Sequence, residues 1–516
     1  MDGIISHQTT RAALKDKILG GWTGKAYGCM MGEPMEYRAQ GEIYEGSLAI
    51  HPQAPTTWLH NEDDLYVNMA LLDVVREKGL DATAEDFAKV FRESKFMLWH
   101  ANGQVRQNIK EGIAPGLSGH PFYNPHADDI DFQIECDFIG LICPGLPQSA
   151  GQIADRVGHL MNYGEGYYAG LFLAALYAAA FIETDHRSMI AMAMRAIPAD
   201  CDYAAMLQDL LKWYEEEPDD WRHTWQKLED AWNFDLCPWA KTDAGRFNIQ
   251  GHFNGTYILM GLLHGKGDYI KSISICTRCG QDTDSNVGNC GGILGTLIGY
   301  DKLPQTVKDE LAPYMDRDYN FTTLSNNAAS ELCYRLALEN IERNGGRVDD
   351  EAITIAVQPF TFEGEREISF VGMEFVETFK ALDPALQWHG DWDVEDVRKR
   401  QAGGEVVISS STPGDYVEVV FNGTCIYMQG NLHSNYGIID IYIDGEFIQS
   451  RDMFIDRQWD NCLQSTAVWV TGLNEGQHTL KVAISLEKNA ASSGTEIALG
   501  RVVSYRGAVA PLPEKE

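Results

Sequence analysis

The stretch from Arg278 to Leu297, RCGQDTDSNVGNCGGILGTL, contains residues suited to holding a metal ion. Asp282 and Asp284 stand one residue apart, and Ser285 follows directly with a hydroxyl. Carboxylate and hydroxyl oxygens bind hard divalent cations such as Mg²⁺, and an irregular loop entering a helix can aim both aspartates at one ion. The glycines behind this pair recur every three or four residues, which predicts a helix face that a second helix approaches closely within a bundle; they are Gly288, Gly292, Gly295 and Gly299.

Two upstream stretches have a related composition. Glu62, Asp63 and Asp64 open a segment with helical periodicity, in which apolar residues at 65, 69, 72 and 75 share one face. Negative charge is favourable at a helix start, so this triplet alone indicates no more than a helix cap. The other stretch, GWTGKAYGCMMGEPMEYR, spaces three glycines four residues apart and ends with Glu36; the glycines are Gly24, Gly28 and Gly32.

Together, and in this order, the three stretches resemble the motifs of the ADP-ribosylglycohydrolase superfamily. These motifs are an N-terminal Gly-Asp-Ala-Leu-Gly-x-Pro-x-Glu, a Thr-Asp-Asp-Thr and a late Gly-Gly-Asp-Thr-Asp-Thr. The resemblance covers about residues 12–345. It implies an all-helical fold, two Mg²⁺ ions in a central cleft, and hydrolysis at the anomeric carbon of a ribose, with Mn²⁺ or Ca²⁺ as alternative ions.

The resemblance also assigns roles to residues. Asp63 and Asp64 are similar to the metal-binding pair of the second motif, and Glu36 to the glutamate that closes the first motif and contacts substrate or metal-bound water. We expect catalytic roles for Glu36, Glu62 and Asp63. The expected metal ligands are Glu62, Asp63, Asp64, Asp282, Asp284 and Ser285. Bound ions would polarise the sugar hydroxyls, orient water and stabilise a departing anion.

All three motifs also depart from the family pattern. Cys29 replaces the aspartate of the first motif, Glu62 and Leu65 replace the flanking threonines of the second, and Gln281 replaces the second glycine of the third. We interpret Glu62 first as an additional ligand, with a larger Ca²⁺-like shell or an acid/base role as alternatives. Glu36 and Glu62 could form a glycosidase-like pair, but a retaining or inverting course depends on their separation and stays open.

The segment Gly116–Gly145 replaces a small-residue loop that, in relatives, ends in Ala-Met-Arg and lines the substrate site. Three of its acids, Asp128, Asp131 and Glu135, fall on one face if the segment is helical. Added to the metal carboxylates, they would disfavour a pyrophosphate and suit a neutral glycoside. Further candidates for substrate contacts, for which packing is an equal alternative, are Phe122, Tyr123, His126, Glu165 and Asn254.

The apolar periodicity changes along the chain. It is helical to about residue 347, whereas beyond residue 404 apolar residues alternate and Asn422-Gly423 and Asp444-Gly445 mark tight turns between strands. We predict an all-α catalytic domain at 1–350, a mixed connecting segment at 351–400 and an all-β sandwich at 401–516 that resembles galactose-binding-like jelly rolls. Its candidate sugar-contacting side chains are Trp388, Trp392, His433, Tyr436 and Trp459.

Composition limits the partners. The 41 Lys and Arg against 75 Asp and Glu give a net charge of −34, which disfavours binding to a nucleic-acid backbone.

The apolar run at 167–182 is too short to span a membrane and predicts a buried helix. The 11 cysteines, Cys276 and Cys279 included, are expected as packed, reduced thiols, and with no secretion-signal pattern at residues 1–21 they favour a cytoplasmic location. The sequence gives no indication of oligomeric state.

These features predict a metal-dependent hydrolase that cleaves the glycosidic bond of a ribofuranosyl-type or related small-molecule or oligosaccharide glycoside. One alternative is a true ADP-ribosyl hydrolase acting on protein or nucleotide adducts. The other is an inactive protein that kept the helical scaffold and binds glycans through the β domain. Four clustered carboxylates argue against the last alternative, because they are costly without an ion.

Overall fold

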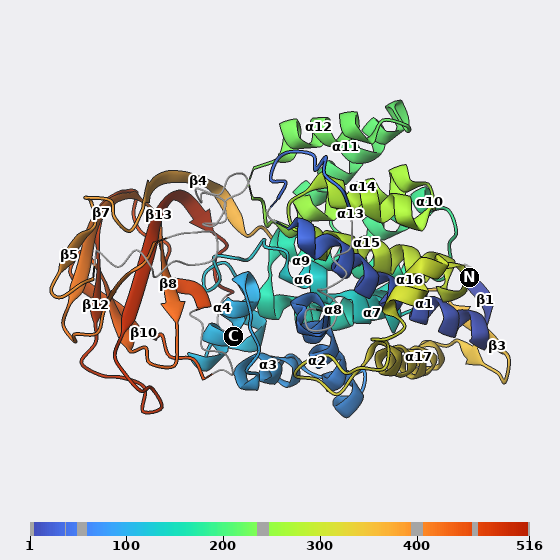
Figure 1. Cartoon of the computed structure of the whole chain (residues 1–516), viewed down its shortest axis with the longest axis horizontal. Helices are drawn as coiled ribbons and strands as arrows, with labels where there is room; N and C mark the ends of the chain where they lie inside the picture. Colours follow the sequence, from blue (N-terminus) through green and yellow to red (C-terminus); the bar gives the residue numbers. More distant parts are fainter. Residues whose placement is uncertain are drawn as a thin grey trace. The chain divides into compact units, whose positions relative to one another are not determined.

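The computed structural model describes residues 5–36, 38–48, 59–234, 247–393, 406–456 and 463–513. The chain divides into two compact units (Figure 1). The helical unit comprises the described residues of 1–90, 128–235 and 247–367, and the β unit those of 91–127 and 368–516.

The helical unit is built around two helices, α1 (Arg11–Gly32) and α15 (Thr283–Ile298), whose backbones lie in close contact. A Cβ added at Gly24 would lie 2.1 Å from the carbonyl oxygen of Gly291, and one at Gly28 would lie equally close to that of Val287. The close helix contact that the glycines predicted is present, and the glycine series of the first motif provides its partner.

Of the four expected glycines, however, only Gly288 and Gly295 both belong to α15 and have α1 as their nearest neighbour. Gly292 lies against the Tyr177 hydroxyl, and Gly299 follows the end of α15. The contact between α1 and α15 brings the ends of both motifs together.

Other helices surround this pair. The helix α9 (Gly164–Ala180) is buried along its whole length, which confirms that the apolar run is a core helix. Among the described residues, no helix is long and apolar enough to cross a membrane. The remaining helices are α2 (Asp63–Lys78), α3 (Ala84–Glu93), α6 (Asp131–Glu135), α7 (Asp137–Leu141), α8 (Pro147–Met161), α10 (His186–Ala193), α11 (Asp202–Glu216), α12 (Trp221–Trp232), α13 (Gly251–Gly265), α14 (Tyr269–Cys279), α16 (Gln305–Leu311) and α17 (Asn326–Arg343).

A small sheet also belongs to the helical unit. Strands β1 (Ser6–Thr10), β3 (Ala352–Ala356) and β2 (Arg347–Val348) pair antiparallel in the order β1-β3-β2. The segment 351–400, which we expected to connect two domains, is thus divided: its first part up to Glu367 belongs to the helical unit, and residues from Ile368 belong to the β unit. Residues 91–127, with α4 (His100–Lys110) and α5 (Pro115–Ser118), also group with the β unit.

The β unit is a sandwich of two antiparallel sheets with one shared core. The first sheet has the order β10-β9-β12-β7-β5, and the second has the order β11-β8-β13-β4 with β6 paired to β13. Apolar residues of both sheets, such as Val419 of β7 and Met428 of β8, form the core between them. The strands are β4 (Phe370–Phe379), β5 (Gln387–His389), β6 (Ile408–Ser410), β7 (Tyr416–Gly423), β8 (Cys425–Leu432), β9 (Ile438–Ile443), β10 (Glu446–Asp452), β11 (Leu463–Val470), β12 (Gly476–Ile484) and β13 (Ile497–Val509).

One of the two expected turns is confirmed. Asp444 and Gly445 have φ of 52° and 84° and join the antiparallel pair β9 and β10. The other turn is wrong, because Asn422 and Gly423 lie within β7, which pairs with β12, while β8 belongs to the other sheet. Gly423 has a φ of 139°, and a Cβ there would lie 2.3 Å from the carbonyl oxygen of Tyr505. It therefore stands where the chain passes from one sheet to the other, and not in a hairpin turn.

Candidate metal centre

Three chain segments of the helical unit present the acidic residues. Glu62 precedes α2, and Asp63 and Asp64 occupy its first turn. Asp282 precedes α15, and Asp284 lies in its first turn. The third segment is the 3-10 helix Glu33–Met35, which continues α1 and is followed by Glu36. Both helix starts favour negative charge through their backbone N–H groups.

The carboxylates converge in two triads. One oxygen each from Glu62, Asp63 and Asp64 lie within 4.8 Å of one another, as do one oxygen each from Glu36, Asp282 and Asp284. The Ser285 hydroxyl donates to Asp64 Oδ1 at 3.2 Å, which joins α15 to α2. The structure thus brings together the residues that the sequence predicts as metal ligands, with Glu36 beside them.

The carboxylates repel one another in a buried setting. Burial raises the pKa of Glu62, Asp64 and Asp282 well above the usual range, and repulsion from Asp284 raises each of them further. The same two causes raise the pKa of Asp63 to about 6. The Lys25 ammonium opposes the rise at Asp64. Charge of this density is unfavourable without a counter-ion.

The unmet bonding capacity of the cluster fits a hard divalent cation. Glu62 Oε1 and Asp284 Oδ1 are buried and have no hydrogen-bond partner among the described residues. The donor set consists of carboxylate and hydroxyl oxygens, which is the set that Mg²⁺, Mn²⁺ and Ca²⁺ take. The residues present therefore fit the ions that the motifs imply.

Cys29, one of the departures from the family pattern, lies against this cluster. It is fully buried, and its thiol donates to Asp64 Oδ2 across 3.9 Å. Burial raises the pKa of the thiol well above the usual range, and the Asp64 carboxylate raises it further. Cys29 is therefore a neutral donor to Asp64, where a family aspartate would carry charge.

The three predicted acids of the substrate segment are all buried. Asp131 and Glu135 are the first and last residues of the short helix α6, whereas Asp128 precedes that helix. The helix face that their spacing predicted is therefore shared only by Asp131 and Glu135. Their contact with a substrate stays a prediction.

Two further substrate candidates bind protein groups. The Glu165 carboxylate accepts hydrogen bonds from the backbone N–H groups of Asp202 and Tyr203 at 3.0 and 2.9 Å, so it caps α11. The Asn254 side chain is buried on α13 and accepts from Asn286, two residues beyond Asp284, at 2.7 Å. Asn254 thereby supports the acidic loop from behind.

The aromatic candidates belong to the β unit. Phe122 is 39% exposed and packs edge-to-face on Tyr123, while His126 is buried beside the ring of Tyr427. Contact of these residues with a sugar stays a prediction, as it does for the candidates of the sandwich. Tyr436 is buried, Trp388 and Trp392 pack with ring centroids 4.7 Å apart, His433 contacts Asn435, and Trp459 lies outside the described residues.

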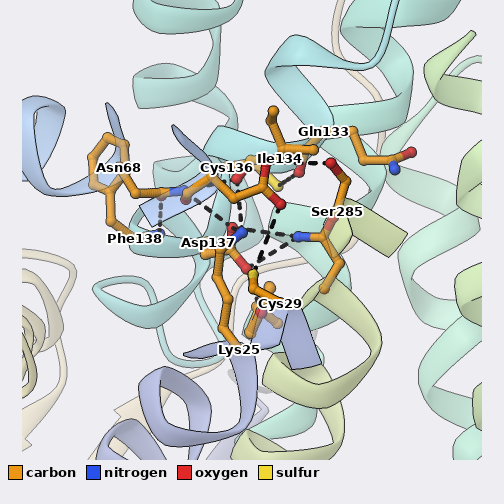
Figure 2. Close-up of polar contacts among 12 residues, drawn as sticks. Lys25, Cys29, Asn68, Gln133, Ile134, Cys136, Asp137, Phe138 and Ser285 are labelled. Carbon is orange, nitrogen blue, oxygen red and sulfur yellow. Dashed lines mark hydrogen bonds and ion pairs between the residues drawn. The ribbon is translucent and has the colours of Figure 1, made fainter. Parts of the chain in front are cut away.

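A polar network that the sequence motifs do not indicate lies beside the acidic cluster. Figure 2 shows Lys25 and Asp137 at its centre, with Asn68 and Cys29 close by. Two features of the sequence could have indicated the network. Lys25 stands among the glycines of α1, and Asp137 interrupts the apolar run CDFIGLIC. A buried charge of either sign requires a partner, but the sequence does not say which.

Comparison with known proteins agrees with the motifs. The ADP-ribosylglycohydrolase family profile matches residues 10–339. An A type blood alpha-D-galactosamine galactosaminidase of Flavonifractor plautii is 24% identical over 106 residues, which are 20% of this chain and 9% of that enzyme's length.

Solved structures with partial similarity include an ADP-ribosylglycohydrolase-related protein complex, at 14% identity, with a TM-score of 0.42 over 64% of this chain and 99% of that one. A CBM35 from Paenibacillus barcinonensis is 18% identical, with a TM-score of 0.19 over 25% of this chain and 98% of that one. The profile match covers more than half of the sequence, and the chain belongs to the ADP-ribosylglycohydrolase family.

Proposed function

We propose that this protein is a metal-dependent hydrolase that cleaves the glycosidic bond at the anomeric carbon of a neutral furanosyl or related glycoside. The observation that carries the proposal is the pair of carboxylate triads with two buried, unpartnered oxygens, Glu62 Oε1 and Asp284 Oδ1. Family membership supports hydrolysis of a glycosidic bond. The short match to a galactosaminidase is in line with a sugar substrate.

The six carboxylates differ in their access to solvent, which separates their roles. Asp64, Asp282, Asp284 and Glu62 are buried, whereas Glu36 and Asp63 are partly exposed. Bound divalent cations would polarise sugar hydroxyls and lower the pKa of a water molecule. Glu36, the partly exposed member of its triad, is the carboxylate that we assign to proton transfer with water or the leaving group.

The charge of the site favours a neutral substrate over ADP-ribose. Six carboxylates gather there, and Lys25, the cation that acts on Asp64, is itself fully buried and paired with Asp137. The carboxylates would repel a pyrophosphate unless bound metal ions and the N-termini of α2 and α15 offset their charge, while sugar hydroxyls can donate to the carboxylates. A true ADP-ribosyl hydrolase remains the alternative that family membership itself favours.

Metal binding and sugar release test the proposal. The wild type and Asp284→Asn would be titrated with Mg²⁺, Mn²⁺ and Ca²⁺ by calorimetry, then given two substrate panels: ADP-ribose derivatives, and neutral aryl furanosides, pyranosides and galactosaminides. Asp185→Asn is the matched control, because Asp185 caps α10 at the surface. We expect turnover of neutral glycosides that Asp284→Asn abolishes and Asp185→Asn preserves.

The other outcomes are equally clear. Turnover confined to ADP-ribose derivatives would establish the ADP-ribosyl alternative. Metal binding without turnover of either panel would favour a glycan-binding protein on the same scaffold. A folded wild type that binds none of the three cations at millimolar concentration would refute metal dependence.

A further inference from the structure

A buried ion pair lies beside the acidic cluster. Lys25 is fully buried on α1, and its ammonium donates to Asp137 Oδ2 at 2.6 Å and to the carbonyl of Ile134 at 2.8 Å. Asp137 is equally buried and accepts from the Tyr177 hydroxyl at 2.5 Å and from Asn289 at 3.1 Å. Both members of the pair therefore have hydrogen-bond partners besides each other, which a buried pair needs for stability.

The network around this pair reaches both helices that present the triads. Asn68, one turn beyond Asp64 on α2, donates to the backbone carbonyls of Asp64 and Ile134, each at 2.7 Å. Asn289 lies on α15, five residues beyond Asp284. Asn68 also donates to Asp137 Oδ2 at 3.4 Å (Figure 2). A change in the pair is thus transmitted to α2 and α15 directly.

The ammonium also acts on the cluster through its charge. Burial alone would lower the pKa of Lys25, but the carboxylates of Asp137 and Asp64 outweigh burial and raise it, so the lysine is charged at neutral pH. Asp137 and Lys25 together carry no net charge. Without Asp137, the Lys25 charge would repel a cation bound at the neighbouring triad.

We infer that Lys25 and Asp137 are positioning residues that set the affinity of the Glu62–Asp63–Asp64 triad for a divalent cation. Asp137 neutralises Lys25 and thereby permits the cation to bind, while Lys25 limits the repulsion that Asp64 meets when no cation is present. The inference rests on the proposed metal dependence. It goes beyond it by assigning a role to residues that lie outside the family motifs.

A charge cycle tests the inference without relying on activity. Asp137→Asn leaves the lysine charge unbalanced, Lys25→Met leaves an extra negative charge, and Lys25→Met/Asp137→Asn restores neutrality. We expect the Mn²⁺ dissociation constant, measured by calorimetry, to rise about tenfold or more in Asp137→Asn and to return to within about threefold of wild type in the double variant. Lys25→Met should bind Mn²⁺ more tightly than wild type.

The control is Lys17→Met, two turns earlier on α1, where the lysine donates to the Ala180 carbonyl. It should lower the melting temperature without changing Mn²⁺ affinity. If all three cycle variants weaken binding alike, the pair has only a structural role and the inference fails, as it does if none changes affinity. Should Lys25→Met not fold, Asp137→Asn and the double variant still decide between these results. A wild type that binds no Mn²⁺ would instead refute the proposed function, and the inference with it.

Discussion

Replacing Asp63 by asparagine should stabilise the metal-free protein at neutral pH. Burial and repulsion from Asp284 raise the pKa of Asp63 from 3.8 to about 6. A difference of roughly two units corresponds to about 3 kcal/mol between the two protonation states. The pKa of Asp63 is higher in the folded than in the unfolded protein. The folded protein therefore keeps the full stability of protonated Asp63 below pH 3.8, and loses it as the pH rises through 6 and the side chain ionises.

The substitution removes this loss. In EDTA at pH 7.5, Asp63→Asn should therefore raise the melting temperature by about 5 °C, since 1 kcal/mol corresponds to roughly 2–4 °C for 150–250 residues and to less for this larger unit. At pH 4 the gain should vanish. Saturating Mg²⁺ or Mn²⁺ should stabilise the wild type and have less effect on the variant, because the variant lacks a ligand.

The control is Asp86→Asn, which also changes an aspartate in the first turn of a helix. Hydrogen bonds from the backbone N–H and hydroxyl of Thr83 hold the pKa of Asp86 below its usual range, so this variant should lose stability at neutral pH. An Asp63→Asn variant that melts at or below the wild-type temperature in EDTA at pH 7.5 would refute the electrostatic reasoning. So would a gain that persists unchanged at pH 4.

Other elements yield further predictions. Gly24→Ala should destabilise the protein by more than about 3 kcal/mol in denaturant unfolding, because its Cβ would overlap the backbone of Gly291, whereas Gly116→Ala, with open space around it, should not. Glu165→Ala should cost about 1–2 kcal/mol by removing the cap of α11, with Mn²⁺ affinity unchanged in calorimetry. His159 contacts two carboxylates that outweigh its burial and raise its pKa to about 10, so His159→Asn should lower stability at pH 6 and show a shrinking deficit in melting temperature as the pH approaches 10.

The sequence predicted what is local or periodic. The acidic residues stand within a few positions of one another, and the two glycine series repeat at helical spacing, so their presence on helix starts and helix faces follows from the chain alone. The spacing does not show that Gly24 packs against Gly291. It shows only that the glycine faces of α1 and α15 each need a close neighbour, and packing the two faces together satisfies both. The helical and β classes follow from the same periodicities.

Contacts between residues far apart in the sequence could not be predicted from local patterns. Lys25 and Asp137 are 112 positions apart, and no local pattern links them. The Asn422-Gly423 pair has the composition of a hairpin turn, but the partner of a strand is chosen by the whole sheet, and β7 pairs with β12. In the same way, spacing placed Asp128 on a helix face with Asp131, while the helix begins only at Asp131.

The departures from the family motifs become intelligible when their positions are compared. A family aspartate is replaced by Cys29, which removes a carboxylate, and a family threonine is replaced by Glu62, which adds one. The structure places both at the same group: the Cys29 thiol contacts Asp64, and Glu62 belongs to the Asp64 triad. Relative to the motif pattern, one carboxylate is thus lost on α1 and one is gained just before α2. If the cluster holds a cation as proposed above, these exchanges would change the position of one ligand without removing the electrostatic need for an ion.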